Sequence, residues 1–331
     1  MKRARTHVLV VLMVVGMAAI GLGQSPQAAE YPVKGRPITL IVGFAAGGAN
    51  DIAARTLAPL LAKEIGTPVQ VVNKVGAGGQ IGWTEVARAK PDGYTLGYTM
   101  FMPIVTTYLD TSRTPSYNRS SFQPLGNHVK LAHILAVGVN SPYRTTKDLI
   151  DAAKAKPGQI KAGLSGILSN THLGTLEFQR VTGTRFASVT FDGSAPAITA
   201  LLGGHIDLTA APAPDVVGHL RGGTLRILGV MDDTENKMLP GVTTFESQGY
   251  KVYANGAGGL AAPAGVSNEV IATISAALKK TMEDKAHIEK LEQLGFSPYY
   301  LTPQQHAESW INYEKMIAPL IEMAKQDMEK K

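Results

Sequence analysis

The sequence contains no cysteine among its 331 residues. Disulfides, lipid attachment at a cysteine and thiolate ligation of a metal are therefore excluded. A chain of this length can bury enough apolar surface to fold without disulfides. No two histidines stand four residues apart, the spacing that places a zinc-binding pair on one helix face. We expect neither a metal nor another cofactor.

The chain also lacks a concentrated block of charge. Its formal net charge is +6, and three of the cations, Lys2, Arg3 and Arg5, precede the first acidic residue, Glu30. The remainder carries only about +3. No cluster of basic residues interleaved with aromatics is present, although such a cluster marks most nucleic-acid-binding surfaces. We expect no nucleic-acid partner.

No apolar run near the N-terminus reaches the ~20 residues that a membrane-spanning helix needs. The run Val8–Leu22 follows the three cations and precedes a stretch of small and polar residues. This three-part layout is typical of a secretory signal peptide. We expect residues 1–29 to be removed and the mature protein to be exported, with a retained membrane anchor as the weaker alternative.

Short aliphatic runs alternate with helical segments along the rest of the chain, which is typical of parallel sheets wrapped by helices. The first series predicts strands at 38–44, 69–72 and 95–98 and helices at 51–65 and 81–89. The second predicts strands at 134–139, 160–163, 186–191, 206–210 and 225–230, with helices at 147–154, 171–182, 195–202 and 216–220. Residues 108–124 are interpreted as a surface connection. We therefore expect an α/β fold with two domains.

Two later helices carry their own start signals. Thr145 is followed three residues later by Asp148, which predicts a capping box. Thr302, Pro303 and Gln305 combine a cap, a first-turn proline and a capping-box glutamine. The C-terminal helix should begin near Pro303.

The stretch 38–55 is the most informative one, because a buried strand, a glycine turn and a helix start follow one another. Gly47 and Gly48 allow close approach of the backbone to a bound group. The free N–H groups of a helix start favour an anion, most simply a carboxylate. Asp51 either pairs with Arg55 four residues later or accepts a hydrogen bond from a ligand.

A second loop, 165–172, is the counterpart of the first in the second series. It offers hydroxyls, an amide and another helix start, and no fixed negative charge. Ser169 or Asn170 alone would suffice to cap the helix. Together with the glycine loop, it suggests that two donor-rich loops from two domains close on one small anion.

Two other patterns invite enzymatic interpretations. The glycine-rich segment 76–82 has Ile81 where a dinucleotide fingerprint requires its third glycine, so a tight turn beside a helix is favoured. Ser165 and His172 are available for a hydrolase triad, but Ser165 does not stand in a nucleophile elbow. An exported hydrolase is a minor alternative, and we expect no enzyme activity.

A series of short motifs stands along the chain: Tyr31-Pro32, 44–51 with Arg55, 76–79 with Gly82, 90–96, 193–197, 201–204, Leu239-Pro240 and 262–265. In these motifs the chain resembles the extracytoplasmic solute receptors of the tripartite tricarboxylate transporter family, also called Bug receptors. The resemblance implies a type II periplasmic binding protein, with two α/β lobes joined by a hinge and a ligand cleft between them. Placed on this sequence, lobe one is 31–131 plus 254–331 and lobe two is 132–253.

The resemblance also implies a periplasmic, monomeric receptor that passes a small organic acid to membrane permease subunits. A receptor that feeds a two-component sensor is the alternative. This chain departs from the family where Phe191-Asp192 replaces an aromatic followed by a basic residue, and where Met100 to Met102 replace small polar residues. We therefore expect a monocarboxylate with an apolar or aromatic body.

The candidate ligand-binding residues come from the two loops, from the segments that follow the neighbouring strands and from those departures. They are Phe44, Ala45, Ala46, Gly48, Asn50, Asp51, Met100, Met102, Ser165, Ser169, Asn170, Thr171, His172, Phe191, Asp192 and Ala211.

Overall fold

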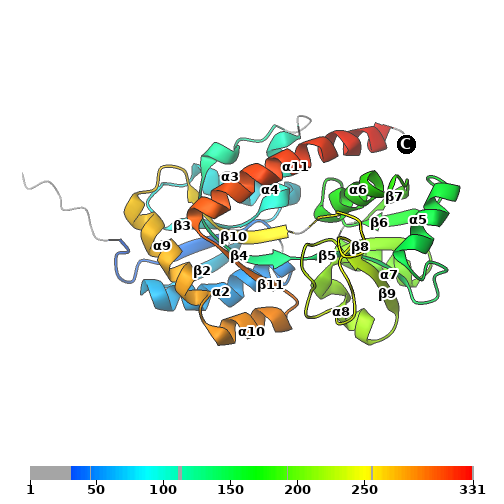
Figure 1. Ribbon diagram of the computed structural model, residues 1–331. Helices are drawn as coiled ribbons and strands as arrows, with labels where there is room; N and C mark the ends of the chain where they lie inside the picture. Colours follow the sequence, from blue (N-terminus) through cyan, green and yellow to red (C-terminus); the bar gives the residue numbers. More distant parts are fainter. Residues whose placement is uncertain (1–30, 45, 111–113, 192, 255, 330–331) are drawn as a thin grey trace, which may run out of the picture.

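The computed structural model describes residues 31–329 except 45, 111–113, 192 and 255, and the expected signal peptide lies outside this part. Two separate sheets organise the described chain, one at each end of an elongated molecule (Figure 1). We call the six-stranded sheet with its helices lobe one, and the five-stranded sheet with its helices lobe two. Across the described residues no helix is both long and apolar enough to cross a bilayer.

Lobe one has the strand order β11-β4-β10-β3-β1-β2. Its strands are β1 (Ile38–Val42), β2 (Val69–Asn73), β3 (Thr95–Met100), β4 (Phe122–Leu131), β10 (Gly256–Pro263) and β11 (Ser297–Leu301). Its helices are α2 (Ala49–Ile65), α3 (Gln80–Arg88), α4 (Phe101–Leu109), α9 (Asn268–Thr281), α10 (Lys285–Gln293) and α11 (Pro303–Glu329). Ile38, Leu40, Ile41 and Val42 of β1 are fully buried, as befits a central strand covered on both faces.

Lobe two has the strand order β7-β6-β8-β5-β9. Its strands are β5 (His133–Gly138), β6 (Lys161–Leu164), β7 (Ala187–Thr190), β8 (Leu208–Pro212) and β9 (Leu225–Val230). Its helices are α5 (Thr146–Ala155), α6 (Asn170–Thr182), α7 (Ser194–Leu202) and α8 (Ala213–Arg221). The predicted alternation of strands and helices is confirmed here element by element.

The parallel pairing that the alternation indicates is confirmed for β1 with β2 and β3, and for β6 with β7 and β8, but both sheets also contain antiparallel strands. In lobe one, β10 runs antiparallel to β3 and β4, and β11 runs antiparallel to β4. In lobe two, β5 runs antiparallel to both β8 and β9. These reversals arise because β4 passes directly into β5, and β10 brings the chain back into the first sheet after lobe two is complete.

The interpretation of 108–124 as a surface connection is also corrected. The helix α4 extends to Leu109, and β4 begins at Phe122. Tyr117 and Phe122 are 4% and 5% exposed, and Phe122 stacks on Trp310 with 5.6 Å between ring centroids. Because the segment is rich in polar residues, its sequence did not indicate that these aromatic side chains are buried against the C-terminal helix.

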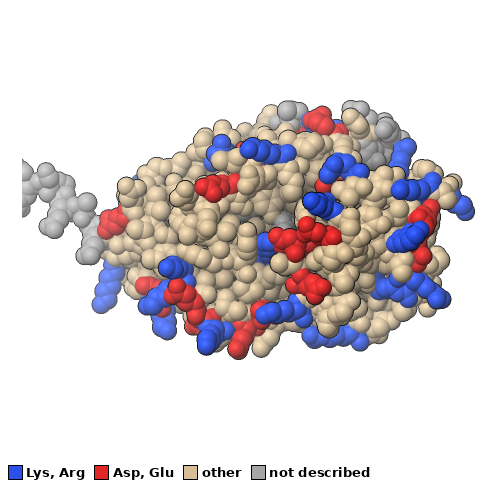
Figure 2. Space-filling view, viewed as in Figure 1, with Lys and Arg blue, Asp and Glu red and all other residues tan. Residues whose placement is uncertain are grey.

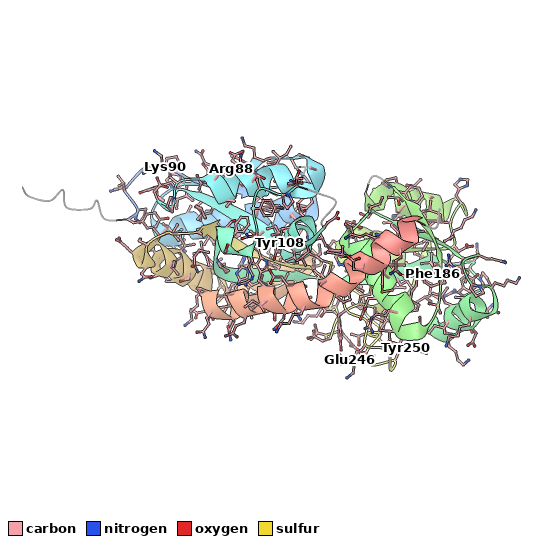
Figure 3. The ribbon with its side chains drawn as sticks, turned by 90° about the horizontal axis from the view of Figure 1, so that it is seen from above. Arg88, Lys90, Tyr108, Phe186, Glu246 and Tyr250 are labelled. Carbon is pink, nitrogen blue, oxygen red and sulfur yellow. The ribbon has the colours of Figure 1, made fainter. Side chains whose placement is uncertain are left out.

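The helix α11 begins at Pro303, as predicted, and crosses from lobe one toward lobe two (Figures 1 and 3). It packs on α4 and β4 of lobe one and on α6 of lobe two. Tyr108 lies beside it, donates a hydrogen bond to Glu314 and accepts one from Trp310 Nε1 at 3.0 Å. The two predicted caps are confirmed, since Thr302 pairs with Gln305 and Thr145 with Asp148.

Candidate ligand-binding cleft

A cavity of about 570 Å³ lies between the two lobes. Such a volume suits a small organic molecule. Lobe one lines it with Phe44, Gly48, Ala49, Asn50, Gly78, Pro103, Thr106, Thr107 and Leu131. Lobe two lines it with His133, residues 165–170 and 193–195, Pro212 and Asp215. A hollow of about 620 Å³ beside Val139 and Leu202 takes its lining from lobe two alone.

The topology explains why these residues meet. In lobe two, β6 runs parallel to β7 and β8, so Ser165, Ser194 and Asp215, which follow these strands, lie at one edge of the sheet. The strand β5 runs the opposite way and places its first residue, His133, opposite Pro212 at the same edge. Ligands of open α/β sheets bind outside the carboxyl ends of the strands, which is where this cavity lies.

The lobe-one wall is a helix start without a side-chain cap. Gly47 has a φ of 80°, and Gly48 occupies the N-cap position of α2 with no side-chain hydrogen bond to the first turn. The N–H groups of that turn therefore have no side-chain acceptor and can receive an anion. Behind the loop, Gly82 packs against Gly43 so closely that a Cβ at Gly82 would stand 3.0 Å from the Gly43 Cα. This confirms the interpretation of 76–82 as a tight turn beside a helix.

Asp51 fixes this loop from behind. Its carboxylate accepts hydrogen bonds from Gly47 N and Asn73 Nδ2, both at 2.9 Å, and from Arg55 Nε at 2.9 and 3.0 Å. Burial acts to raise the pKa of Asp51, but the hydrogen bonds from Arg55, Gly47 and Asn73 outweigh it and hold the pKa below its usual value. The predicted Asp51–Arg55 pair is confirmed, and Asp51 is 3% exposed and absent from the cavity lining.

The lobe-two wall is a cluster of three hydroxyls. Thr171 Oγ1 lies 2.8 Å from Ser165 Oγ and 2.9 Å from Ser169 Oγ, and it accepts the N–H of Ser165 at 2.8 Å. Ser169 is the N-cap of α6 and accepts the N–H of His172 at 3.3 Å. Ser169 therefore caps the helix, as one interpretation of the sequence held, and lines the cavity as well.

Leu168 in the same loop has a φ of 57°, in the left-handed region that leucine rarely adopts. Its N–H donates to His172 Nδ1 at 3.1 Å. Strained backbone is often found at functional sites, where the surrounding structure holds it in place. This bond and the hydroxyl cluster hold the loop in that conformation.

The structure does not assemble the hydrolase pair. A Ser–His nucleophile requires the hydroxyl to bond to the imidazole. Here Ser165 Oγ bonds to Thr171 and Ser169, while Nδ1 of His172 is occupied by the N–H of Leu168. No group of three His, Cys, Asp or Glu side chains within the described part of the chain is placed to hold a metal ion.

The predicted site residues divide into three groups. Along the cavity lie Phe44, Gly48, Asn50, Ser165, Ser169 and Asn170. Outside its lining lie Ala46, Asp51, Met102, Thr171, His172, Phe191 and Ala211. Ala45, Asp192 and the side chain of Met100 lie outside the described part.

Packing explains the second group. Met102 belongs to the core of lobe one with Trp83, because the segment after β3 is a helix that turns this side chain inward. Ala211 is fully buried in β8. Thr171 and His172 act on the wall from behind, through their bonds to Ser165, Ser169 and Leu168.

Sequence reasoning missed several lining residues. Pro103, Thr106 and Thr107 lie on α4, which was not predicted, and the hydroxyl of Thr107 donates to the Pro103 carbonyl at 2.8 Å. Ser194 and Asp215 lie on α7 and α8, which were predicted. Both residues come shortly after a predicted strand, as Ser165 does, so the sequence contained the signal that would have identified them.

Charge is spread over both lobes on the face seen in Figure 2, but it is sparse inside the cavity. No lysine or arginine is found among the described lining residues, and Asp215 is their one carboxylate. His133 is 3% exposed, and burial lowers its pKa to about 4, so it is neutral at pH 7. An anion held here therefore depends on helix starts and hydroxyls.

The two α/β lobes, with a cleft formed at the ends of both sheets, define the class of two-lobed periplasmic binding proteins. The model of the tripartite tricarboxylate transporter family receptor matches residues 53–325. The chain belongs to this family of receptors. It is a family of periplasmic solute-binding proteins, so the resemblance seen in the sequence motifs is confirmed.

Individual relatives agree with this assignment. Protein BugT of Bordetella pertussis is 32% identical over 301 residues, which cover 89% of this chain and 91% of BugT. A solved periplasmic transporter is 31% identical, with a TM-score of 0.77 over 88% of this chain and 97% of the other. A protein of R. palustris solved with adipate is 27% identical, with a TM-score of 0.76 over 88% of this chain and 98% of the other.

Proposed function

We propose that this receptor captures a small organic acid with one carboxylate and an apolar or aromatic body, and delivers it to the membrane permease subunits of a tripartite tricarboxylate-type transporter. The observation that carries the proposal is the pair of donor-rich helix starts, α2 and α6, which face one cavity whose described lining holds no lysine or arginine. One carboxylate can be satisfied by such donors, whereas two or three would need more positive charge.

The carboxylate is proposed to lie between the Gly48–Asn50 turn and the Ser165–Asn170 loop. Phe44, Pro103 and Leu131 offer an apolar surface for the rest of the ligand. Three or four charge-assisted hydrogen bonds at ~1.5–3 kcal/mol each are enough for micromolar binding, about 8 kcal/mol, after ordering costs.

Closure of the lobes is the proposed signal to the permease, with hinges near residues 131–132 and 253–254. Ile167 supports this proposal, because it lines the cavity and is still 49% exposed. An apolar side chain left open in a cleft gains burial when the opposite wall moves onto it. The protein acts as a monomer and without chemistry on its ligand, so the ligand should be recovered unchanged after long incubation with excess protein.

A calorimetric panel on protein lacking residues 1–29 tests the ligand class. Aliphatic and aromatic monocarboxylates are compared with adipate, malate and citrate at one pH and ionic strength. We expect a monocarboxylate to bind tightest, with an affinity that is lost in its primary amide. Tightest binding of citrate or another tricarboxylate would refute the proposed ligand class.

A further inference from the structure

Asp215 is unusual among the residues that line the cleft, because it brings a negative charge to a site proposed to bind an anion. It stands in the first turn of α8, where a carboxylate would ordinarily close a capping box with the N-cap residue. The N-cap here is Pro212, which has no N–H to donate. The local helix therefore gives this carboxylate no such bond.

The partner that Asp215 does have comes from another helix. Ser194, the first residue of α7, donates its hydroxyl to Asp215 Oδ2. Both residues line the cavity, and Ser194 follows β7 as Asp215 follows β8. The bond fixes one carboxylate oxygen and leaves Oδ1 with acceptor capacity on the wall of the cleft.

The surroundings of Asp215 provide little compensating charge. The described lining contains no lysine or arginine, and His133, which stands opposite Pro212 on the neighbouring strand, is neutral. The surrounding protein partly desolvates the Asp215 carboxylate and raises its pKa, although the hydrogen bond from Ser194 acts against this, and part of the side chain stays in contact with water. The side chain is accessible in the open cleft, and closure would remove it from water without a counter-charge, which is unfavourable.

We propose that Asp215 accepts a hydrogen bond from a donor group on the ligand, an ammonium or a hydroxyl, at the end remote from the carboxylate. This rests on the proposed function and refines it: the acceptable ligands are amino or hydroxy acids, and dicarboxylates are rejected. Asp215 therefore selects the ligand by its second functional group, while the helix starts bind the first. Ser194 is a positioning residue that orients the Asp215 carboxylate.

Two matched series of acids test this selection by calorimetry. The six-carbon series is hexanoate, 6-hydroxyhexanoate, 6-aminohexanoate and adipate, and the four-carbon series is butyrate, 4-hydroxybutyrate, 4-aminobutyrate and succinate. Within a series only the remote group changes. We expect the hydroxy or amino member to bind about tenfold more tightly than the unsubstituted acid and the diacid. The comparison between these two members shows which donor Asp215 prefers.

The variant Asp215→Asn keeps the shape of the side chain and removes its charge. We expect it to lose the preference for the hydroxy or amino member over the unsubstituted acid and to bind the diacid more tightly. The matched control is Asp151→Asn, which removes the same charge from the exposed surface of α5, outside the cavity lining, and should keep the preference.

If hexanoate binds the wild type as tightly as both 6-hydroxyhexanoate and 6-aminohexanoate, or if a preference for either survives in Asp215→Asn, the role of Asp215 is overturned and the proposed function still stands. Tightest binding of adipate or succinate by the wild type would contradict the proposed one-carboxylate ligand class itself, and the inference with it.

Discussion

Each wall of the cleft holds a helix start that faces the cavity, and the two walls do so by different means. On the lobe-one wall, Gly48 leaves the first turn of α2 without a side-chain cap, and a buried carboxylate, Asp51, ties the loop from behind. On the lobe-two wall, Ser169 caps α6, and Thr171 joins two serine hydroxyls. The first wall therefore presents backbone donors and the second presents side chains.

This difference indicates how ligand choice can vary within one fold. The backbone N–H groups of the lobe-one wall can recognise the charge and the shape of a ligand, and a change of side chain does not alter the chemistry of these donors. A side-chain wall can change its chemistry one residue at a time, and Ser165, Ser194 and Asp215 all belong to it. We infer that lobe one binds the carboxylate common to the ligands, and that lobe two determines which ligand is preferred.

The largest loss of stability and binding is expected from a substitution of Asp51, which fixes the loop of the lobe-one wall through its hydrogen bonds. Asp51→Ala removes a carboxylate that accepts bonds from Gly47, Arg55 and Asn73 and leaves these donors without it. We expect a loss of about 3 kcal/mol in the free energy of unfolding, measured with urea, and strongly weakened ligand binding. The control Asp151→Ala breaks the exposed pair with Lys147 and should leave the midpoint unchanged. Equal behaviour of the two variants would contradict the structural role of Asp51.

Substitutions in the lobe-two wall should lower the stability of the protein less than Asp51→Ala does, but they should change which ligand binds best. Thr171→Val keeps the volume of the side chain and removes the hydroxyl that joins Ser165 and Ser169. We expect a loss of about 2 kcal/mol in unfolding free energy and a change in the ranking of ligands, measured by calorimetry on one panel. The matched variant Thr175→Val in the same helix removes a hydroxyl bonded only to the Thr171 carbonyl, and should keep the ranking. An unchanged ranking in both would show that lobe two does not set specificity through this cluster.

The sequence predicted the side-chain wall less completely than the backbone wall, for a physical reason. Glycines before a helix start are a local signal, so the 47–48 turn and the Asp51–Arg55 pair were both foreseen. Asp215 and Ser194 reach the cleft only because β6, β7 and β8 run parallel. Strand order is set by contacts distant in sequence, which a periodic pattern does not encode.

Two of the strands that the sequence did not predict, β4 and β10, have a composition that is unusual for strands. The strand β4 carries a proline and a glycine within Phe122–Leu131, and β10 is composed largely of glycine and alanine. Such residues have low strand propensity. Their conformation is imposed by pairing, as at Gly259, where an added Cβ would stand 2.4 Å from the Gly126 carbonyl oxygen. The antiparallel pair β4 and β10 is therefore the part of the fold that local pattern describes worst.

The smallest effect tests whether the glycine turn matters for its backbone shape alone. Gly47 has a φ of 80°, and a Cβ added there meets nothing within 4 Å, so Gly47→Ala imposes conformational strain without a clash. We expect about 1 kcal/mol less stability and weaker ligand binding, because the Gly47 N–H must stay aligned on Asp51. The comparison is Gly218→Ala in α8, where there is also open space but no positive φ, and helix propensity should raise stability by up to about 1 kcal/mol. If both substitutions stabilise the protein, the turn tolerates a side chain, and the backbone wall owes its shape to Asp51 and its partners alone.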